Sequence, residues 1–332
     1  MNEQPKDIRA DFQPIDLRKF VDPLKTLQGD ARAEVDLTRL ETLWINTGTL
    51  CNIECKNCYI KSSPTNDQLV YFTLDDALAF YDEIKSLDLA TPEIGFTGGE
   101  PFMNPQILEM IEAALQRGFN VLVLTNAMQP MQRKRIKQGL ISLNAKYADQ
   151  LALRVSLDHY TKDLHEVERG AETWSKVLAG LGWLSQNNFN IAIAGRTCWG
   201  EPEETERQGY ATLIAGHNWP VDSQNYGQLI LFPEMDEQVD VPEITTACWG
   251  ILGKVPDDVM CATSRMVVRR KDANAATVLP CTLLPYDAGF DMGSNLAQSL
   301  VKNGGNFNNG AVKLNHPHCA KFCVLGGGSC TA

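Results

Sequence analysis

The sequence lacks any apolar run of about 18 residues or more, the minimum expected of a membrane-spanning helix. Residues 1–20 are polar and mixed in charge, and they lack the basic start and the apolar core of a secretory signal peptide. These two absences predict a cytoplasmic protein without a membrane partner.

Basic residues are also in short supply. The chain has 30 Lys and Arg residues against 41 Asp and Glu residues, which gives a net charge of −11. Because the phosphate backbone of a nucleic acid repels an acidic surface, a tRNA or rRNA partner is disfavoured. A local basic run at residues 133–135, with Lys137, is more typical of the solvated face of a helix.

Cysteine, by contrast, is abundant, with ten residues in a chain of 332. Thiols stay reduced in the cytoplasm, so we expect metal or redox chemistry from these cysteines rather than disulfides. The length and the apolar content of 44% suffice for one large domain and a smaller one.

Three of the cysteines, Cys51, Cys55 and Cys58, form a C-x3-C-x2-C motif. Residues 43–48 just before it alternate between apolar and polar side chains, which predicts a strand and places the cysteines on the loop that follows it. Three thiolates from one loop can hold three irons of a [4Fe–4S] cubane and leave the fourth iron open for chemistry. A structural zinc site and three unrelated buried thiols are the alternatives.

A second motif, Thr-Gly-Gly-Glu-Pro at residues 97–101, follows about 40 residues later at the end of another predicted strand. Two glycines allow the backbone to approach a ligand closely and to expose its polar groups. An ordinary turn is the alternative for this motif alone.

Strand and helix patterns alternate from residue 43 to residue 232. Six strand–helix units in about 190 residues predict an α/β fold with a parallel sheet and right-handed crossovers. Six strands are fewer than the eight of a closed barrel. The predicted strands cover residues 43–48, 94–97, 120–125, 151–157, 190–195 and 228–232, and the predicted helices cover residues 74–84, 105–117, 131–143, 174–184 and 202–215.

The two motifs and their spacing resemble the signature of the radical S-adenosylmethionine (radical SAM) superfamily. In that family the open iron chelates the amino and carboxylate groups of S-adenosylmethionine (SAM), and one electron from the cluster releases a 5′-deoxyadenosyl radical. The resemblance implies a partial (β/α)6 TIM-like barrel, with Cys51, Cys55 and Cys58 as the ligands of the catalytic cluster. The residue before the third cysteine is commonly aromatic in the family, whereas this chain has Asn57 there and Tyr59 after the cysteine.

The same resemblance implies further cofactor-binding residues at the strand ends. Ser156 and Arg169 would bind the SAM carboxylate, which suits a hydroxyl and a guanidinium. Asp158 would bind the ribose or the substrate, unless it only forms a surface ion pair with Arg169. The expected SAM-binding residues are Gly98, Gly99, Glu100, Asn126, Ser156, Asp158 and Arg169, and Arg196 is expected to point towards the same opening.

The remaining cysteines gather towards the end of the chain. Cys261 and Cys281 stand at the open ends of a predicted hairpin formed by residues 266–270 and 277–279. With Cys319, Cys323 and Cys330 they resemble the auxiliary cluster domains called twitch or SPASM. We expect one auxiliary [4Fe–4S] cluster held by Cys261, Cys281 and two of the last three cysteines. Zinc is the alternative metal here, Cys248 is a candidate ligand of a second cluster, and Cys198 is expected to be a packed thiol.

These inferences divide the chain into an N-terminal lead-in (1–40), a radical SAM partial barrel (41–240) and a small α+β iron–sulfur domain (241–332). The lead-in is expected to be too short for a domain that recognises precursor peptides.

The resemblance implies reductive cleavage of SAM and abstraction of a hydrogen atom, with electrons from a flavodoxin- or ferredoxin-type donor. An auxiliary cluster suggests oxidative modification of a peptide or an amino-acid-derived substrate. A small-molecule oxidoreductase or isomerase that acts on a sugar, a nucleoside or a natural product is the alternative. An iron–sulfur electron carrier without catalysis is the alternative from another class.

Overall fold

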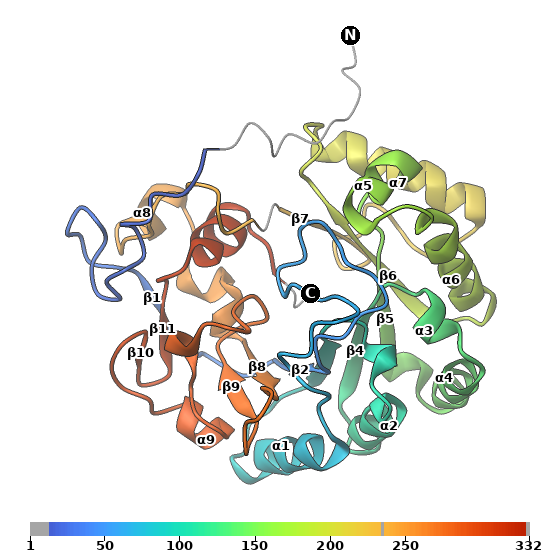
Figure 1. The fold of residues 1–332 in the computed structure, drawn as a ribbon, viewed down its shortest axis with the longest axis horizontal. Helices are drawn as coiled ribbons and strands as arrows, with labels where there is room; N and C mark the ends of the chain where they lie inside the picture. Colours follow the sequence, from blue (N-terminus) through green and yellow to red (C-terminus); the bar gives the residue numbers. More distant parts are fainter. Residues whose placement is uncertain (1–12, 234–235, 330–332) are drawn as a thin grey trace.

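An eight-stranded sheet forms the centre of the computed structural model, which describes residues 13–233 and 236–329 (Figure 1). The strand order is β7-β6-β5-β4-β3-β2-β8-β9, and every neighbouring pair is parallel except β8 with β9. The strands are β2 (Thr42–Asn46), β3 (Glu93–Thr97), β4 (Asn120–Thr125), β5 (Leu151–Ser156), β6 (Asn190–Arg196), β7 (Leu229–Phe232), β8 (Ser264–Val268) and β9 (Thr277–Leu279).

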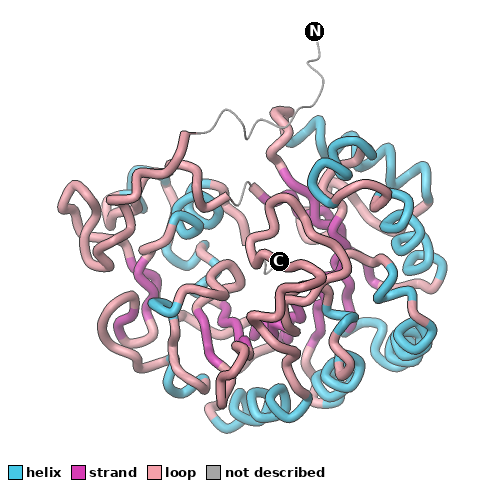
Figure 2. Tube along the Cα trace, viewed as in Figure 1, coloured by secondary structure: helices cyan, strands magenta, loops and turns pink. Residues whose placement is uncertain are grey.

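Helices follow the strands and cover the outer side of the curved sheet, so that the sheet's inner side and the loops at the strand ends remain for the site (Figures 1 and 2). Within the described ranges, no helix is long and apolar enough to cross a membrane. The helices are α1 (Leu74–Ser86), α2 (Ile107–Gln116), α3 (Gln129–Gln132), α4 (Lys134–Tyr147), α5 (Lys162–Arg169), α6 (Trp174–Gln186) and α7 (Glu203–His217).

The predicted α/β fold and its order of strands and helices are confirmed. Thr73 caps α1, because its hydroxyl oxygen accepts the N–H of Asp76 at 3.1 Å. The helix predicted for residues 131–143 is wrong in its bounds, because the extended backbone of Arg133 separates α3 from α4. Helix α5 was not predicted, since its residues are mostly polar and its only buried side chains are His165 and Glu168.

The predicted hairpin near the C-terminal end is confirmed as β8 and β9, although β8 begins and ends two residues before the predicted bounds. Strand β8 also pairs with β2, so the central sheet continues across the predicted boundary between residues 240 and 241. The rest of this region contains α8 (Cys248–Leu252), α9 (Leu296–Ser299), a π-helix (Cys319–Leu325) and two strands of a small three-stranded sheet, β10 (Phe307–Asn308) and β11 (Ala311–Lys313).

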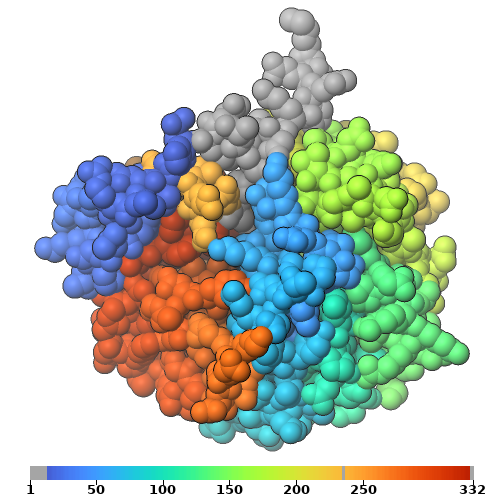
Figure 3. All heavy atoms as spheres, in the orientation of Figure 1, coloured from blue at the N-terminus to red at the C-terminus, as the bar shows by residue number. Residues whose placement is uncertain are grey.

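The N-terminal segment packs against this C-terminal region. Strand β1 (Glu34–Val35) pairs with β11 (Ala311–Lys313), which in turn pairs with β10 (Phe307–Asn308). Arg32 forms a buried ion pair of 2.6 Å with Glu243. The start of the described chain therefore lies beside its C-terminal third, at the left of Figures 1 and 3.

Candidate active site

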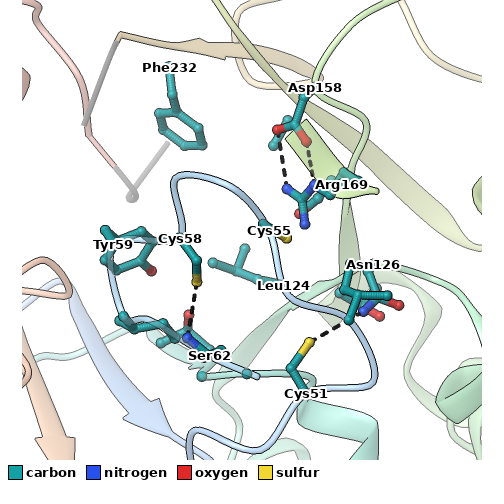
Figure 4. Close-up of a pocket in the computed structure, with 18 of the residues that line it drawn as sticks. Cys51, Cys55, Cys58, Tyr59, Ser62, Leu124, Asn126, Asp158, Arg169 and Phe232 are labelled. Carbon is teal, nitrogen blue, oxygen red and sulfur yellow. Dashed lines mark hydrogen bonds and ion pairs between the residues drawn. The ribbon is translucent and has the colours of Figure 1, made fainter. Parts of the chain in front are cut away.

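The three cysteines of the first motif lie on the loop after β2 and face a cavity of about 130 Å³ at the carboxyl ends of the strands (Figure 4). Cys51, Cys55 and Cys58 all line it, as the sequence predicts for ligands of one cluster. The opposite wall is formed by residues from β5, β6 and β7, and by Phe322 from the π-helix.

Two N–H groups point at the cysteine sulfurs. The backbone N–H of Ser62 donates to Cys58 Sγ at 3.4 Å, and the side-chain amide of Asn126 donates to Cys51 Sγ at 3.8 Å. Both bonds orient the sulfurs within the loop. Burial raises the pKa of Cys51 to about 12 and that of Cys55 to about 11. Bound iron would hold the buried Cys51 and Cys55 as thiolates, so this set of three sulfurs on one loop fits an iron cluster.

The glycine turn packs directly against the start of the cysteine loop. Gly99 donates its N–H to the carbonyl of Gly48 at 2.7 Å, and Glu100 donates to Leu50 at 3.1 Å. A Cβ atom on Gly99 would lie 2.2 Å from the carbonyl oxygen of Leu50, and Gly98 has a φ of +135°. Both glycines also line the cavity. Only glycine therefore allows the ends of β2 and β3 to approach this closely.

Glu100 lies behind the cavity wall and is 2% exposed. Its carboxylate accepts the hydroxyl of Thr125 at 2.8 Å and the backbone N–H groups of Asn126 at 2.9 Å and Phe102 at 3.2 Å. Burial raises its pKa to about 7. Glu100 thus orients the end of β4, while a contact between its carboxylate and the SAM amino group stays a prediction.

Asp158 is held between two arginines and is 2% exposed, so it is not part of a surface ion pair. Arg169 binds both of its oxygens, and Arg196 Nε lies 3.3 Å from Oδ1. Although burial opposes ionisation, the two guanidinium groups lower the pKa of Asp158 to about 2. Ser156 lines the cavity beside these residues. The strand-end residues expected to bind SAM therefore face the same space as the cysteines.

The residues of the cavity wall that sequence reasoning missed include an arginine and three aromatic residues. Arg154 precedes Ser156 by two positions on β5, so strand alternation could have placed it on the same face. Tyr59, Phe232 and Phe322 supply aromatic surface, and the last two rings lie 5.6 Å apart. Phe322 comes from the far end of the chain, and no local pattern predicts its position.

A second group of cysteines lines a much smaller cavity of about 10 Å³ in the C-terminal region. Cys319 and Cys323 lie four residues apart on the π-helix, and Cys261 and Cys281 lie at the open end of the β8–β9 hairpin. His318 lines the same cavity, and buried Arg265 donates to the carbonyl of Cys261 at 2.7 Å.

The other cysteines lie elsewhere or outside the described ranges. Cys248 Sγ accepts the N–H of Thr245 at 3.4 Å and does not line this second cavity, and Cys198 is a buried thiol. The predicted candidate Cys330 lies outside the described residues. Among the described cysteines there is no disulfide. Among the described residues, no group of three or more Cys, His, Asp or Glu side chains is close enough together to hold a single metal ion. A [4Fe–4S] cluster makes a different demand, because each thiolate binds its own iron.

Comparison with known proteins gives relatives that each match part of the chain. The subtilosin biosynthesis protein AlbA of Bacillus subtilis is 24% identical over 57% of this chain and 41% of its own length. An AdoMet-dependent heme synthase of Methanosarcina barkeri is 27% identical over 43% of this chain and 38% of its own length. The chain thus spans less than half of these curated relatives.

Solved structures support the same fold. Streptococcus suis SuiB bound to SAM matches with a TM-score of 0.55 and 12% identity, over 79% of this chain and 64% of that protein. SuiB bound to its precursor peptide SuiA matches equally well, with a TM-score of 0.55. At this identity the likeness concerns the fold alone.

A family model described as the radical SAM superfamily matches residues 45–212. This match runs from β2 to α7 and includes the cysteine loop, the glycine turn and the strand ends that face the cavity. Because it covers half of the chain, we conclude that the chain belongs to the radical SAM superfamily, so that a [4Fe–4S] cluster and SAM are its cofactors.

Proposed function

We propose that this chain cleaves SAM reductively and uses the resulting 5′-deoxyadenosyl radical to take a hydrogen atom from a peptide or an amino-acid-derived substrate. The observation that carries the proposal is the convergence of Cys51, Cys55 and Cys58 with Ser156 and the held Arg169 on one cavity. An electron carrier without catalysis would have no use for the strand-end residues.

Each group in the cavity has a separate task in this proposal. The three thiolates would hold the cluster, and the bound cluster would supply the electron for the reductive cleavage of SAM. Ser156 and Arg169 bind the SAM carboxylate by charge-assisted hydrogen bonds, and Asp158 keeps the Arg169 guanidinium in place. The aromatic wall formed by Phe232 and Phe322 keeps water away from the radical.

We infer a second cluster in the C-terminal region, held by the four cysteines that line one cavity there. Four thiolates suffice for one [4Fe–4S] cluster. The backbone carbonyl of Cys261 anchors the Arg265 guanidinium close by, and this positive charge would stabilise a cluster with a net negative charge. The proposed ligands are Cys261, Cys281, Cys319 and Cys323.

The printed descriptions of the relatives favour a peptide substrate. AlbA is named for the biosynthesis of a bacteriocin, and SuiB has been crystallised with a precursor peptide. A small-molecule substrate is the second candidate, because another relative is named as a heme synthase. A cytoplasmic flavodoxin- or ferredoxin-type electron donor stays a prediction from the sequence.

The test starts with the protein purified and reconstituted without oxygen. Iron and labile sulfide are counted per chain for the wild type and for a Cys51/Cys55/Cys58→Ala triple variant, and both are incubated with SAM and dithionite. We expect about eight irons in the wild type and about four in the variant, with 5′-deoxyadenosine formed by the wild type only.

Other outcomes separate the parts of the proposal. About four irons in the wild type, all lost in the triple variant, would contradict the second cluster. A wild type with its full iron but no 5′-deoxyadenosine would contradict SAM cleavage and favour an electron carrier.

A further inference from the structure

The end of α5 holds the cysteine loop from outside the cavity. The carboxylate of Glu168, a residue only 1% exposed, accepts the backbone N–H of Asn57 at 3.0 Å through Oε1 and its side-chain amide at 3.3 Å through Oε2. The backbone carbonyl of Glu168 accepts the N–H of Lys56 at 2.8 Å. One residue therefore fixes two consecutive positions of the loop, both between Cys55 and Cys58.

Arg196, at the end of β6, also contacts Asn57, from the side of the loop that faces the sheet. Its Nη2 donates to the carbonyl oxygen of Asn57 at 3.2 Å and lies 3.6 Å from Oε1 of Glu168. Its Nε lies 3.3 Å from Asp158, which also binds Arg169. Asn57, Glu168 and Arg196, here called the loop lock, are thus continuous with the Asp158–Arg169 pair in the cavity wall.

We propose that the loop lock positions the catalytic cluster, with Glu168 and Arg196 as positioning residues that hold the middle of the cysteine loop and tie it to Arg169. A loop without regular structure has many conformations, whereas a cluster needs its three sulfurs fixed together. Hydrogen bonds to a buried carboxylate are charge-assisted and therefore strong enough to hold such a loop. The inference rests on the proposed function for the identity of the cluster, but the contacts of the lock do not depend on it.

Two substitutions break the lock, and their combination restores it. Glu168→Gln replaces the charged acceptor with a neutral amide that has one oxygen, so only one of the two N–H groups of Asn57 keeps its acceptor and that bond is no longer charge-assisted. Asn57→Asp brings a second carboxylate against Glu168. In the double variant the glutamine NH2 faces the aspartate, so that a donor meets an acceptor again. Asn57→Ala removes the side-chain bond alone and leaves α5 intact.

A matched control lies on the same helix. The carboxylate of Glu166 accepts the N–H of Trp174 at 3.2 Å and has no hydrogen bond to the cysteine loop. Glu166→Gln therefore repeats the chemical change of Glu168→Gln on α5 without touching the lock.

Hydrogen exchange of residues 51–62, measured by mass spectrometry on the chain without cluster, reports the lock directly. We expect exchange roughly tenfold faster in Glu168→Gln and in Asn57→Asp, a smaller increase in Asn57→Ala, and wild-type exchange in the double variant and in Glu166→Gln. The second measurement uses the reconstituted protein and follows the iron bound by Cys51, Cys55 and Cys58, which is identified as the iron that the Cys51/Cys55/Cys58→Ala variant lacks. A chelator should remove this iron roughly 10- to 100-fold faster from the two single variants than from the wild type.

Exchange at the wild-type rate in both single variants would overturn the inference. The inference would also fail if the fold-increase in exchange rate of the double variant equalled the product of the fold-increases of the two single variants, because the two substitutions would then act independently. Thermal unfolding shows whether a variant has lost its fold. If one of the single variants has, the exchange rate of Asn57→Ala is compared with that of the wild type instead. A wild-type chain that holds no N-terminal cluster contradicts the proposed function, but the exchange test still decides the lock.

Discussion

Glu206 on α7 is a buried carboxyl group apart from the cavity. Its side chain is fully buried, and neither oxygen has a hydrogen-bond partner among the described residues. Burial, together with the charges of Glu201 and Glu203, raises its pKa to about 8 from the usual 4.5. The contribution of this group to stability is therefore complete below about pH 4.5 and is lost as the pH rises through about 8.

We expect Glu206→Gln to remove this pH dependence, because the amide stays neutral. Thermal unfolding at pH 5 should be nearly the same for the variant and the wild type. At pH 9 the variant should be more stable by about 1 to 3 kcal/mol, since the wild type then buries an unpaired charge. Glu204→Gln, an exposed position on the same helical turn, is the control and should leave both values unchanged. Equal pH dependence in Glu206→Gln and the wild type would contradict this account.

Residues that carry chemistry were easier to predict from the sequence than the residues that hold them. Motif spacing led to Cys51 and the family resemblance led to Ser156, and both line the cavity because the carboxyl ends of parallel strands meet at one edge of a sheet. The same reasoning gave no role to Glu168, whose partner Asn57 lies 111 positions away. Contacts of this kind depend on how α5 packs, and α5 is a short helix with only two apolar residues, Leu164 and Val167, to indicate it in the sequence.

Helix α6 carries two glycines with opposite surroundings. A Cβ atom on Gly180 would lie 2.1 Å from the carbonyl oxygen of Ala127, so this glycine permits close packing of α6 against the segment after β4. A Cβ atom on Gly182 would meet no atom within 4 Å. Both lie inside the same helix, so the backbone entropy that alanine would save is similar at the two positions while their neighbours differ.

This contrast gives a matched pair of stability predictions. Gly182→Ala should raise the free energy of unfolding by about 0.5 to 1 kcal/mol, because alanine loses less backbone entropy in a helix. Gly180→Ala should lower it by about 1 to 3 kcal/mol, because the new methyl group overpacks the contact with Ala127. Denaturant unfolding of both variants measures the two changes. A loss of stability in Gly182→Ala, or none in Gly180→Ala, would contradict the packing of α6.

Elements that repeat a strong local pattern were the predictable ones. Strand β4 was predicted with the bounds that the structure has, because its apolar run is nearly continuous, as a buried parallel strand requires. The π-helix was not predicted, since its turn brings together residues with two different destinations: Phe322 lines the first cavity, whereas Cys319 and Cys323 line the second. A segment that serves two sites has no single periodic face.

At the scale of the whole molecule, the C-terminal region and the barrel share structure. Strand β8 continues the central sheet beside β2, all five of whose residues are buried. Phe322 completes the wall of the first cavity, and the hydroxyl of Tyr286 donates to the carbonyl of Ile60 at 2.6 Å, just after the cysteine loop. The sequence predicts a boundary between residues 240 and 241, and the pairing of β2 with β8 crosses it as a long-range contact that local sequence patterns do not encode.

The sharing of one sheet leads to a prediction about truncation. A chain that ends at Asp240 would lose β8 and expose the edge of β2, and an exposed apolar edge strand promotes aggregation. We expect this chain to aggregate and to show no cooperative unfolding in urea followed by circular dichroism. A chain that ends at Ser329 keeps every described residue of the C-terminal region and should unfold like the full chain, with the same iron content if Cys330 is not a ligand. Cooperative unfolding of the chain that ends at Asp240 would instead mean that residues 41–240 fold on their own and that the pairing of β2 with β8 adds little to their stability.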